Sequence, residues 1–245
     1  MPVGVAGEWG GGGVSDPNAH PIRAVAELFP DTTAWIRALV AAIPYAGGAL
    51  DHLLFDKAYS IKMRNLETVV NALGEQLRTI EENSISAEWF RSEEALAAIK
   101  LLSEKSAYEP DTEKIQTLGR VTAVCGTREH ADDPHKLSVL EHLSRLNSTQ
   151  IKLLGAVHRT PAAQQVFSTA EFTQTISSVW IVNILQTIEK QGLFEKGTVD
   201  LMEEFEVLEA LNVVRRVVPM GGGNLGFNLT KIGKRAAKYL DSIAH

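Results

Sequence analysis

The densest group of potential metal ligands in this sequence lies between residues 125 and 142. Imidazole, thiolate and carboxylate groups are the usual protein ligands of zinc and similar divalent metals. However, the group contains neither the His-Glu-x-x-His nor the Cys-x-x-Cys spacing that many metal sites use. We therefore interpret it as a solvated loop between helices and predict no bound metal. Its members are Cys125, Glu129, His130, Asp132, Asp133, His135 and His142.

Other patterns that carry catalytic chemistry are missing from the sequence. There is no Gly-x-x-x-x-Gly-Lys-Ser/Thr phosphate loop, and the glycine runs 10–13 and 221–223 do not precede a helix start. No serine stands in a nucleophile-elbow sequence. The adjacent Asp51 and His52 fit a surface pair or a capping contact better than an acid–base dyad. The sequence predicts no enzyme and no cofactor.

Charges of opposite sign follow one another near the C-terminus and form the candidate binding site. The predicted helix 198–211 carries carboxylates and no lysine or arginine, whereas the residues after it are basic. Both runs can be solvated faces, but together they favour docking of a protein partner or a second copy. A lone tryptophan in the N-terminal tail is a further candidate anchor. The candidate residues are Glu203, Glu204, Glu206, Arg215, Arg216, Lys231, Lys234, Arg235, Lys238 and Trp9.

The overall composition is that of a globular protein. The chain has 245 residues, of which 44% are hydrophobic and 22% charged, and a net charge of −6. This balance gives no electrostatic reason to expect nucleic acid as the main partner. A single cysteine permits no intramolecular disulfide, and no secretory signal opens the sequence. We therefore expect a cytoplasmic protein.

The C-terminal residues 198–241 predict a helix, a β-hairpin and a second helix. Thr198 is a candidate N-cap, and Asn212 tolerates the left-handed conformation that ends a helix. Valines on either side of two arginines indicate a strand, and Gly221-Gly222-Gly223-Asn224 indicates a turn before the return strand. Thr230 can then cap the last helix. This order is typical of a winged helix, with the hairpin as the wing.

The rest of the chain predicts a mostly α-helical protein. We assign residues 1–30 to a flexible glycine-rich tail, 31–146 to a helical bundle with long antiparallel helices, and 147–245 to the winged-helix domain. Within the last range, Asn147 begins a helix, Ser168 and Glu171 form a capping-box pattern, and a helix over 179–191 ends at a glycine.

The apolar segment from Trp35 to Phe55 is too short and too broken to form a stable membrane span. A spanning helix needs about 20 apolar residues, and Pro44 and Gly47-Gly48 interrupt this one. We interpret it as a tight corner between helices. A hairpin that inserts into membranes only when triggered is the alternative.

Two motifs resemble the bacterial abortive-infection alpha family. They are VLEHLSRLNSTQIKLLGAV, residues 139–157, and LEALNVV followed by FNLTKIGKRAAKYL in the predicted wing and last helix. The second is also similar to the end of MarR-type winged-helix proteins. Asn212 stands where those sequences usually have glycine. The resemblance implies a non-enzymatic component of an anti-phage defence system and brings no catalytic residues.

Three hypotheses follow from the sequence. The first is an interaction or regulatory protein that acts as an accessory subunit in phage defence. The second is a winged-helix transcription regulator that contacts DNA phosphates through Arg215, Arg216 and Lys231. The third is a membrane-disrupting effector that uses the Trp35 to Phe55 segment.

Overall fold

The computed structural model describes residues 52–168, 173–194, 199–218 and 225–243. In these ranges the chain is mostly helical, with one four-stranded antiparallel sheet. None of the helices described is both long and apolar enough to cross a membrane. The predicted tail 1–30, with Trp9, and the residues from Trp35 to Asp51 of the segment considered for membrane insertion lie outside the described residues.

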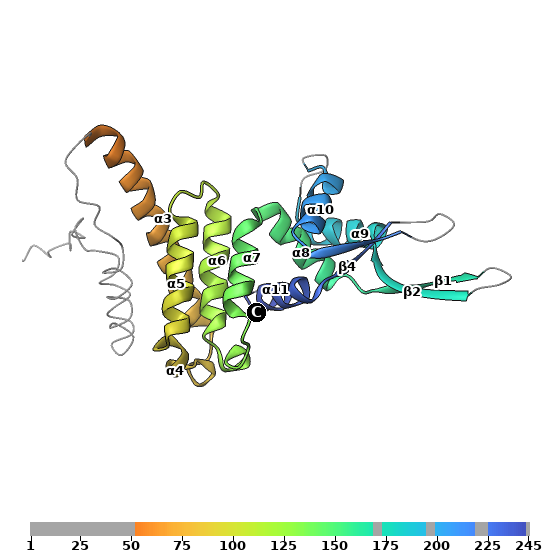
Figure 1. Cartoon of the computed structure of the whole chain (residues 1–245), viewed down its shortest axis with the longest axis horizontal. Coiled ribbons are helices and arrows are strands. Elements are labelled where there is room, and N and C mark those ends of the chain that lie inside the picture. Colours follow the sequence, from red (N-terminus) through yellow and green to blue (C-terminus); the bar gives the residue numbers. More distant parts are fainter. Residues whose placement is uncertain (1–51, 169–172, 195–198, 219–224, 244–245) are drawn as a thin grey trace, which may run out of the picture.

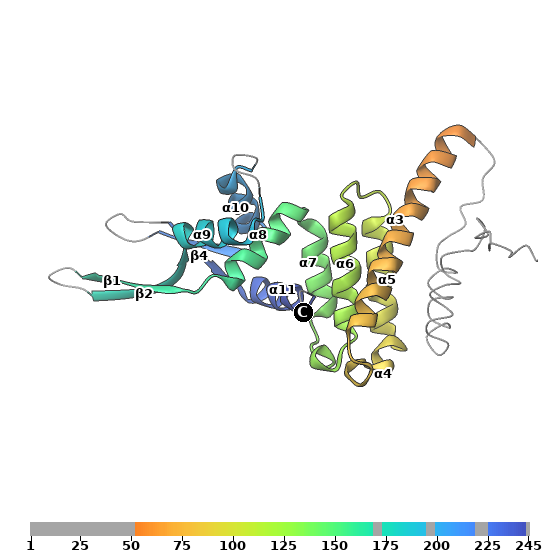
Figure 2. The ribbon, with the colours of Figure 1, turned by 180° about the vertical axis from the view of Figure 1, so that it is seen from behind.

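Four long helices lie side by side in the first part of the chain and form what we call the helical region, residues 52–146 (Figures 1 and 2). A short helix precedes the second of them, and side chains of Ser86, Ser92 and Asp111 cap the helices that follow each residue. The helices are α3 (His52–Thr79), α4 (Ala87–Phe90), α5 (Glu93–Ser106), α6 (Thr112–Cys125) and α7 (Lys136–Arg145).

The remaining residues form the C-terminal region, residues 147–243, which carries the sheet (Figure 1). Its first helix begins with a capping box between Asn147 and Gln150, as the sequence predicts for Asn147. The elements are α8 (Ser148–Arg159), β1 (Ala163–Ser168), β2 (Thr173–Trp180), α9 (Ile181–Gln191), α10 (Leu201–Ala210), β3 (Val214–Val217), β4 (Gly226–Leu229) and α11 (Lys231–Ser242).

The strands pair in the order β1-β2-β4-β3, all antiparallel. The hairpin of β3 and β4 lies where the sequence predicts the wing and is called the wing below; its antiparallel pairing is confirmed, and its assignment to a winged helix stays a prediction. The capping box at Ser168 is wrong, because Ser168 is the last residue of strand β1 and pairs with Thr173. The helix expected from residue 179 begins at Ile181, since Val179 and Trp180 pair with β4.

Left-handed residues end two helices where the sequence predicts them. Gly192 follows α9 with φ 59°, and Asn212 follows α10 with φ 56°. Thr230 caps α11 by accepting a hydrogen bond from the Gly233 N–H. Helix α10, in contrast, is capped by Asp200, whose side chain accepts from the N–H groups of Met202 and Glu203, and Thr198 lies outside the described residues.

Helix α11 joins the two regions, because it packs against α6 and α7 as well as against α8 and β4. Its first turn lies so close to the residue before β3 that a Cβ atom at position 233 would overlap the carbonyl oxygen of Val213. Only glycine fits there. The buried core runs without interruption through both regions, and Phe205 stacks on Phe227 inside it with ring centroids 4.1 Å apart.

Candidate functional site

Several carboxylates of α10 form hydrogen bonds or ion pairs with other residues of the protein. The Glu204 carboxylate accepts a hydrogen bond of 2.8 Å from the side chain of Gln150, which forms the capping box of α8 together with the N-cap Asn147. Arg216 approaches Glu206 at 3.4 Å and Glu209 at 3.1 Å, and its backbone N–H also donates to Glu209. Glu203 is exposed. Of the three predicted partner-binding carboxylates, two therefore have contacts within the fold.

The two arginines that the sequence analysis grouped together point to different places. Successive side chains on a strand lie on opposite faces. Arg216 faces α10 and forms the ion pairs described above, whereas Arg215 is exposed and lines a pocket on the other side of the wing. We therefore count Arg215 among the residues available to a ligand and assign Arg216 to the contact between α10 and β3.

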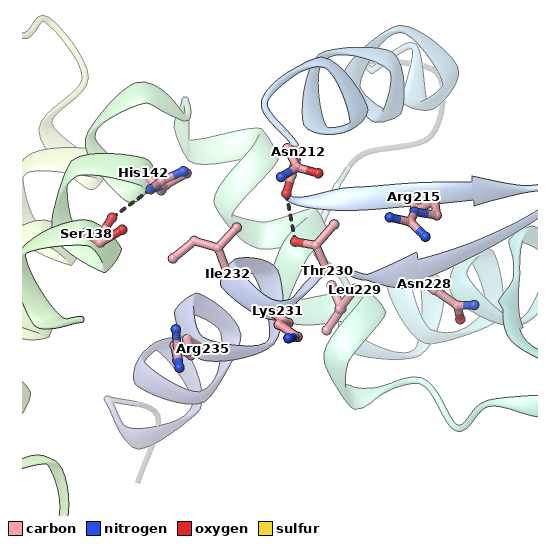
Figure 3. Close-up of a pocket in the computed structure, with 10 residues that line it drawn as sticks. All are labelled: Ser138, His142, Asn212, Arg215, Asn228, Leu229, Thr230, Lys231, Ile232 and Arg235. Atoms are coloured by element: carbon pink, nitrogen blue, oxygen red, sulfur yellow. Dashed lines mark hydrogen bonds between the residues drawn. The ribbon is translucent and has the colours of Figure 1, made fainter. Parts of the chain in front are cut away.

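The pocket lies between α7, the β3–β4 hairpin and the start of α11, and its volume is about 670 Å³. Figure 3 shows side chains of α7 on one side of it, α11 below and the wing on the other side. It therefore receives residues from both regions of the molecule. Its lining consists of Ser138, His142, Asn212, Arg215, Asn228, Leu229, Thr230, Lys231, Ile232 and Arg235.

Polar contacts fix the walls of this pocket. The Thr230 hydroxyl donates to the carbonyl oxygen of Asn212 at 2.7 Å (Figure 3). On the opposite wall, Nδ1 of His142 lies 2.7 Å from the carbonyl oxygen of Ser138. Because a carbonyl oxygen can only accept, Nδ1 carries the proton of that bond. The second ring nitrogen of His142 is not used by this contact.

Three of the lining residues are cationic and none is a carboxylate. Arg215, Lys231 and Arg235 are all exposed, and none of them takes part in an ion pair found among the described residues. The other two predicted cations of α11 lie outside the pocket. Lys234 is exposed, and Lys238 pairs with Glu129 at 3.0 Å, which lowers the pKa of that carboxyl.

The loop that the sequence suggested as a weak metal-site candidate holds no group of three potential ligands within the described residues. It is also less solvated than we expected. Cys125 is buried, and burial raises the pKa of its thiol. His130 is 3% exposed and stacks on Tyr239, with ring centroids 4.1 Å apart and planes inclined by 26°. These side chains serve packing between the loop and α11.

A buried lysine organises the same loop, and the sequence analysis did not identify it. Lys136 is 1% exposed, and its Nζ donates to Glu94 at 3.1 Å and to the carbonyl oxygens of Ala131 at 2.8 Å and Asp133 at 3.1 Å. The Glu94 carboxylate also accepts from the Trp89 indole at 2.7 Å. All three ammonium protons thus have acceptors, as a buried charge requires.

Asp133 extends this contact set to α11. Its carboxylate accepts from the Tyr239 hydroxyl at 3.0 Å and from the backbone N–H of His135 at 2.9 Å. Burial acts to raise the pKa of Asp133, but these hydrogen bonds outweigh it and hold the pKa below its usual value. For Tyr239, burial and then nearby negative charge raise the pKa. The set of Trp89, Glu94, Asp133, Lys136 and Tyr239 is called the lysine network below.

Compared with known proteins, the chain matches no protein-family model, no curated protein and no solved structure. The resemblance to abortive-infection alpha proteins therefore stays a prediction from the motifs quoted above.

Proposed function

We propose that the chain is a non-enzymatic interaction protein whose C-terminal region is a winged helix that docks a protein partner. The order α8, β2, α9, α10, β3, β4, α11 supports this proposal, because it places one strand, two helices and a hairpin between two helices. In such a domain α10 is the helix before the wing. The strand β1 extends the sheet beyond the three strands that this arrangement needs.

The observation that carries the proposal is the charge of α10. A winged helix that reads DNA places the helix before its wing in the major groove, close to phosphates. Here that helix has carboxylates at Glu203, Glu204, Glu206 and Glu209 and no lysine or arginine. Two exposed apolar side chains, Met202 and Val207, accompany them. An acidic surface with apolar side chains suits a basic protein partner better than it suits nucleic acid.

The quoted motifs support a role as an accessory component of a bacterial anti-phage system. Two residues of the second motif have structural roles: Thr230 caps α11, and Gly233 allows the close approach of α11 to Val213. We extend the proposal to that setting on the strength of the resemblance.

The experiment compares recovery of partners by two charge-reversed variants in the native host. Glu203→Lys changes the exposed carboxylate of α10, and Glu104→Lys makes the same change on α5, where the side chain is 64% exposed. Cross-linking followed by purification should recover the same proteins with the wild type and Glu104→Lys, and much less of them with Glu203→Lys. Equal recovery by both variants, or none by the wild type through infection, would contradict docking by α10.

A second candidate function is DNA binding through the wing and α11. It is favoured by one observation, the exposed cations Arg215, Lys231, Lys234 and Arg235 at adjoining positions of β3 and α11. Contacts with phosphates release counterions, so affinity for a duplex should fall steeply between about 50 and 200 mM salt. Absence of a gel shift at low salt and micromolar protein would exclude this function.

A further inference from the structure

We propose that the pocket between α7, the wing and α11 binds a small phosphorylated ligand of about nucleotide size. This site is separate from the docking face on α10 and does not depend on it. Cavities that hold small molecules in proteins measure roughly 300 to 1,000 Å³. The pocket, at about 670 Å³, lies within this range.

The charge of the lining selects an anion. The chain as a whole is acidic, with a net charge of −6, yet every charged residue that lines the pocket is basic. Some cations of the described residues, such as Lys114, Lys136 and Lys152, have carboxylate partners within 3.1 Å, whereas exposed ones such as Arg91 and Lys234 have no ion pair among the described residues. Arg215, Lys231 and Arg235 have no such partner there. A bound anion would supply the partner that the protein does not.

The carboxylate of Asp133 does not neutralise the three cations of the pocket. The charge of Arg235 contributes to lowering the pKa of Asp133, after the hydrogen bonds from His135 and Tyr239. Asp133 is thus engaged in the lysine network and does not line the pocket. Three cationic side chains, one from β3 and two from α11, line the pocket (Figure 3).

Phosphate chemistry fits the remaining donors. The first backbone N–H groups of a helix have no acceptor inside that helix and carry a partial positive charge. In α11, a helix of 12 residues, these belong to Lys231 and Ile232, which both line the pocket. Guanidinium groups add paired donors with the geometry of a phosphate oxygen pair. A tetrahedral oxyanion with several oxygens can use these donors together.

The other lining residues suit the rest of a nucleotide-sized molecule. Ile232 and Leu229 offer apolar contact surface, and the second ring nitrogen of His142 has no partner in the Ser138 contact. The Asn228 amide nitrogen is directed to Ser177 and Ser178 at 3.4 and 3.3 Å, which leaves its oxygen for a ligand donor. A few fixed polar groups beside apolar walls are typical of small-molecule sites.

A free ligand is favoured over the backbone of a nucleic acid. Asn212, at the end of α10, forms part of the pocket wall, so a duplex held there would run on toward the carboxylates of that helix. A small molecule that contacts only the residues lining the pocket does not reach them. Because the walls come from both regions, such a ligand would also hold α7 against α11 and the wing.

The test is titration calorimetry on the full chain at about 100 mM salt, where surface charge is largely screened. The probes are sodium salts of AMP, ADP and ATP, pyrophosphate and inorganic phosphate, together with a short DNA duplex. We expect at least one phosphorylated small molecule to bind with a dissociation constant below about 1 mM. The melting temperature should rise with its concentration, since it binds only the folded state.

Variants then locate the site. The double variant Lys231→Gln with Arg235→Gln should weaken binding by about tenfold or more, because charge-assisted hydrogen bonds are lost. The control is Lys100→Gln, which removes a charge from α5 where the lysine side chain is 74% exposed, and it should leave binding unchanged. Circular dichroism melting of each variant shows that the fold is kept.

Three results would overturn the proposal. One is that no small phosphorylated probe binds at millimolar concentration. Another is equal affinity in the wild type and the double variant, which places the binding elsewhere. The last is binding of the duplex without binding of any nucleotide or pyrophosphate, which would make the pocket a nucleic-acid contact. Loss of partner docking by Glu203→Lys is a separate readout and is unaffected by these results.

Discussion

Cationic side chains have opposite environments in the lysine network and in the pocket, two sites that both include residues of α11. In the lysine network, Lys136 is 1% exposed and every proton of its ammonium group meets an oxygen of the protein. In the pocket, Arg215, Lys231 and Arg235 are exposed and lack ion-pair partners among the described residues. Cationic residues therefore stabilise the fold in the lysine network, whereas in the pocket they are exposed and, in our proposal, bind an anion.

This difference teaches where to look for function. A buried charge must be satisfied by the protein, or the fold is destabilised by several kcal/mol. An exposed charge needs no partner, so a group of like charges around a cavity is not required by folding. Changes in the lysine network should thus affect stability, and changes in the pocket should affect binding. Four predictions test this division, in order of decreasing effect on stability.

The largest effect is expected for Lys136→Met. The substitution leaves Glu94 and two carbonyl oxygens without their common donor. Removal of one partner of a fully buried ion pair costs about 3 to 5 kcal/mol, and since the Glu94 side chain is 31% exposed we expect a loss near the lower end, about 3 kcal/mol. Lys100→Met is the matched control, because the Lys100–Glu104 pair is 4.0 Å apart and exposed, and such pairs contribute less than about 1 kcal/mol. Urea unfolding measures both. If both variants lost a similar free energy of unfolding, the hydrogen bonds of Lys136 would not contribute more to stability than an exposed ion pair.

Gly233→Ala should follow, with a loss of about 1 to 3 kcal/mol from overpacking. The added Cβ overlaps the Val213 carbonyl oxygen, so α11 must shift. Since α11 carries both Tyr239 of the network and Lys231 of the pocket, this variant should weaken stability and ligand binding together. Gly74→Ala is the control, as no atom lies within 4 Å of the Cβ position there. It should be neutral or stabilising in α3. A stable Gly233→Ala variant would show that α11 is not held tightly.

Acidification should weaken the folded state around His130, which stacks on Tyr239 of the lysine network. Burial, and then the charge of Lys238, lower the pKa of His130 below 6.5, although Glu129 opposes the shift. Below that pH the unfolded chain binds a proton that the folded chain does not, so the free energy of unfolding falls as pH falls. Asp133, whose pKa is also lowered, adds a further loss at more acidic pH.

His130→Gln tests this pH dependence by urea unfolding between about pH 7 and 5.5. The slope of stability against pH should become flatter than in the wild type. The exposed His158 provides the control, and His158→Gln should keep the wild-type slope. An unchanged slope in His130→Gln would place the acid sensitivity in another group.

The smallest effect on stability is expected in the pocket. Arg215→Gln and Lys231→Gln should each change the free energy of unfolding by less than about 0.5 kcal/mol, because exposed side chains are replaced. Neutralising one of three like charges can even stabilise the protein slightly. A loss comparable to that of Lys136→Met would show that these cations belong to the fold, and the division between the two sites would fail.

Local signals predicted much of the fold. The capping residues Asn147 and Thr230 and the left-handed residues Gly192 and Asn212 act through their own few neighbours, so a single sequence suffices to find them. The pairing of β3 with β4 was predicted for the same reason, because the valines of β3, the glycines that follow and the residues of β4 are close together in the sequence.

Contacts between distant residues were not predictable in this way. A Ser-x-x-Glu pattern at Ser168 is typical of a helix start, but Ser168 instead ends strand β1, which pairs with β2. Lys136 pairs with Glu94, which lies on another helix, and no local sequence pattern predicts this ion pair. The pocket likewise joins α7 to β3 and α11. Its cations were found from the sequence, whereas His142 was considered there only as a metal ligand.

The position of α11 has a consequence for how the chain folds. This helix is shared by the packing of the helical region and of the sheet, yet it follows both in sequence. During synthesis, the continuous core cannot be completed before residues 231–242 are available to pack against both regions. Long-range contacts of this kind slow folding, because the entropy of closing the loop is lost first. The two regions should accordingly unfold in one cooperative transition, with α11 as the last piece to dock.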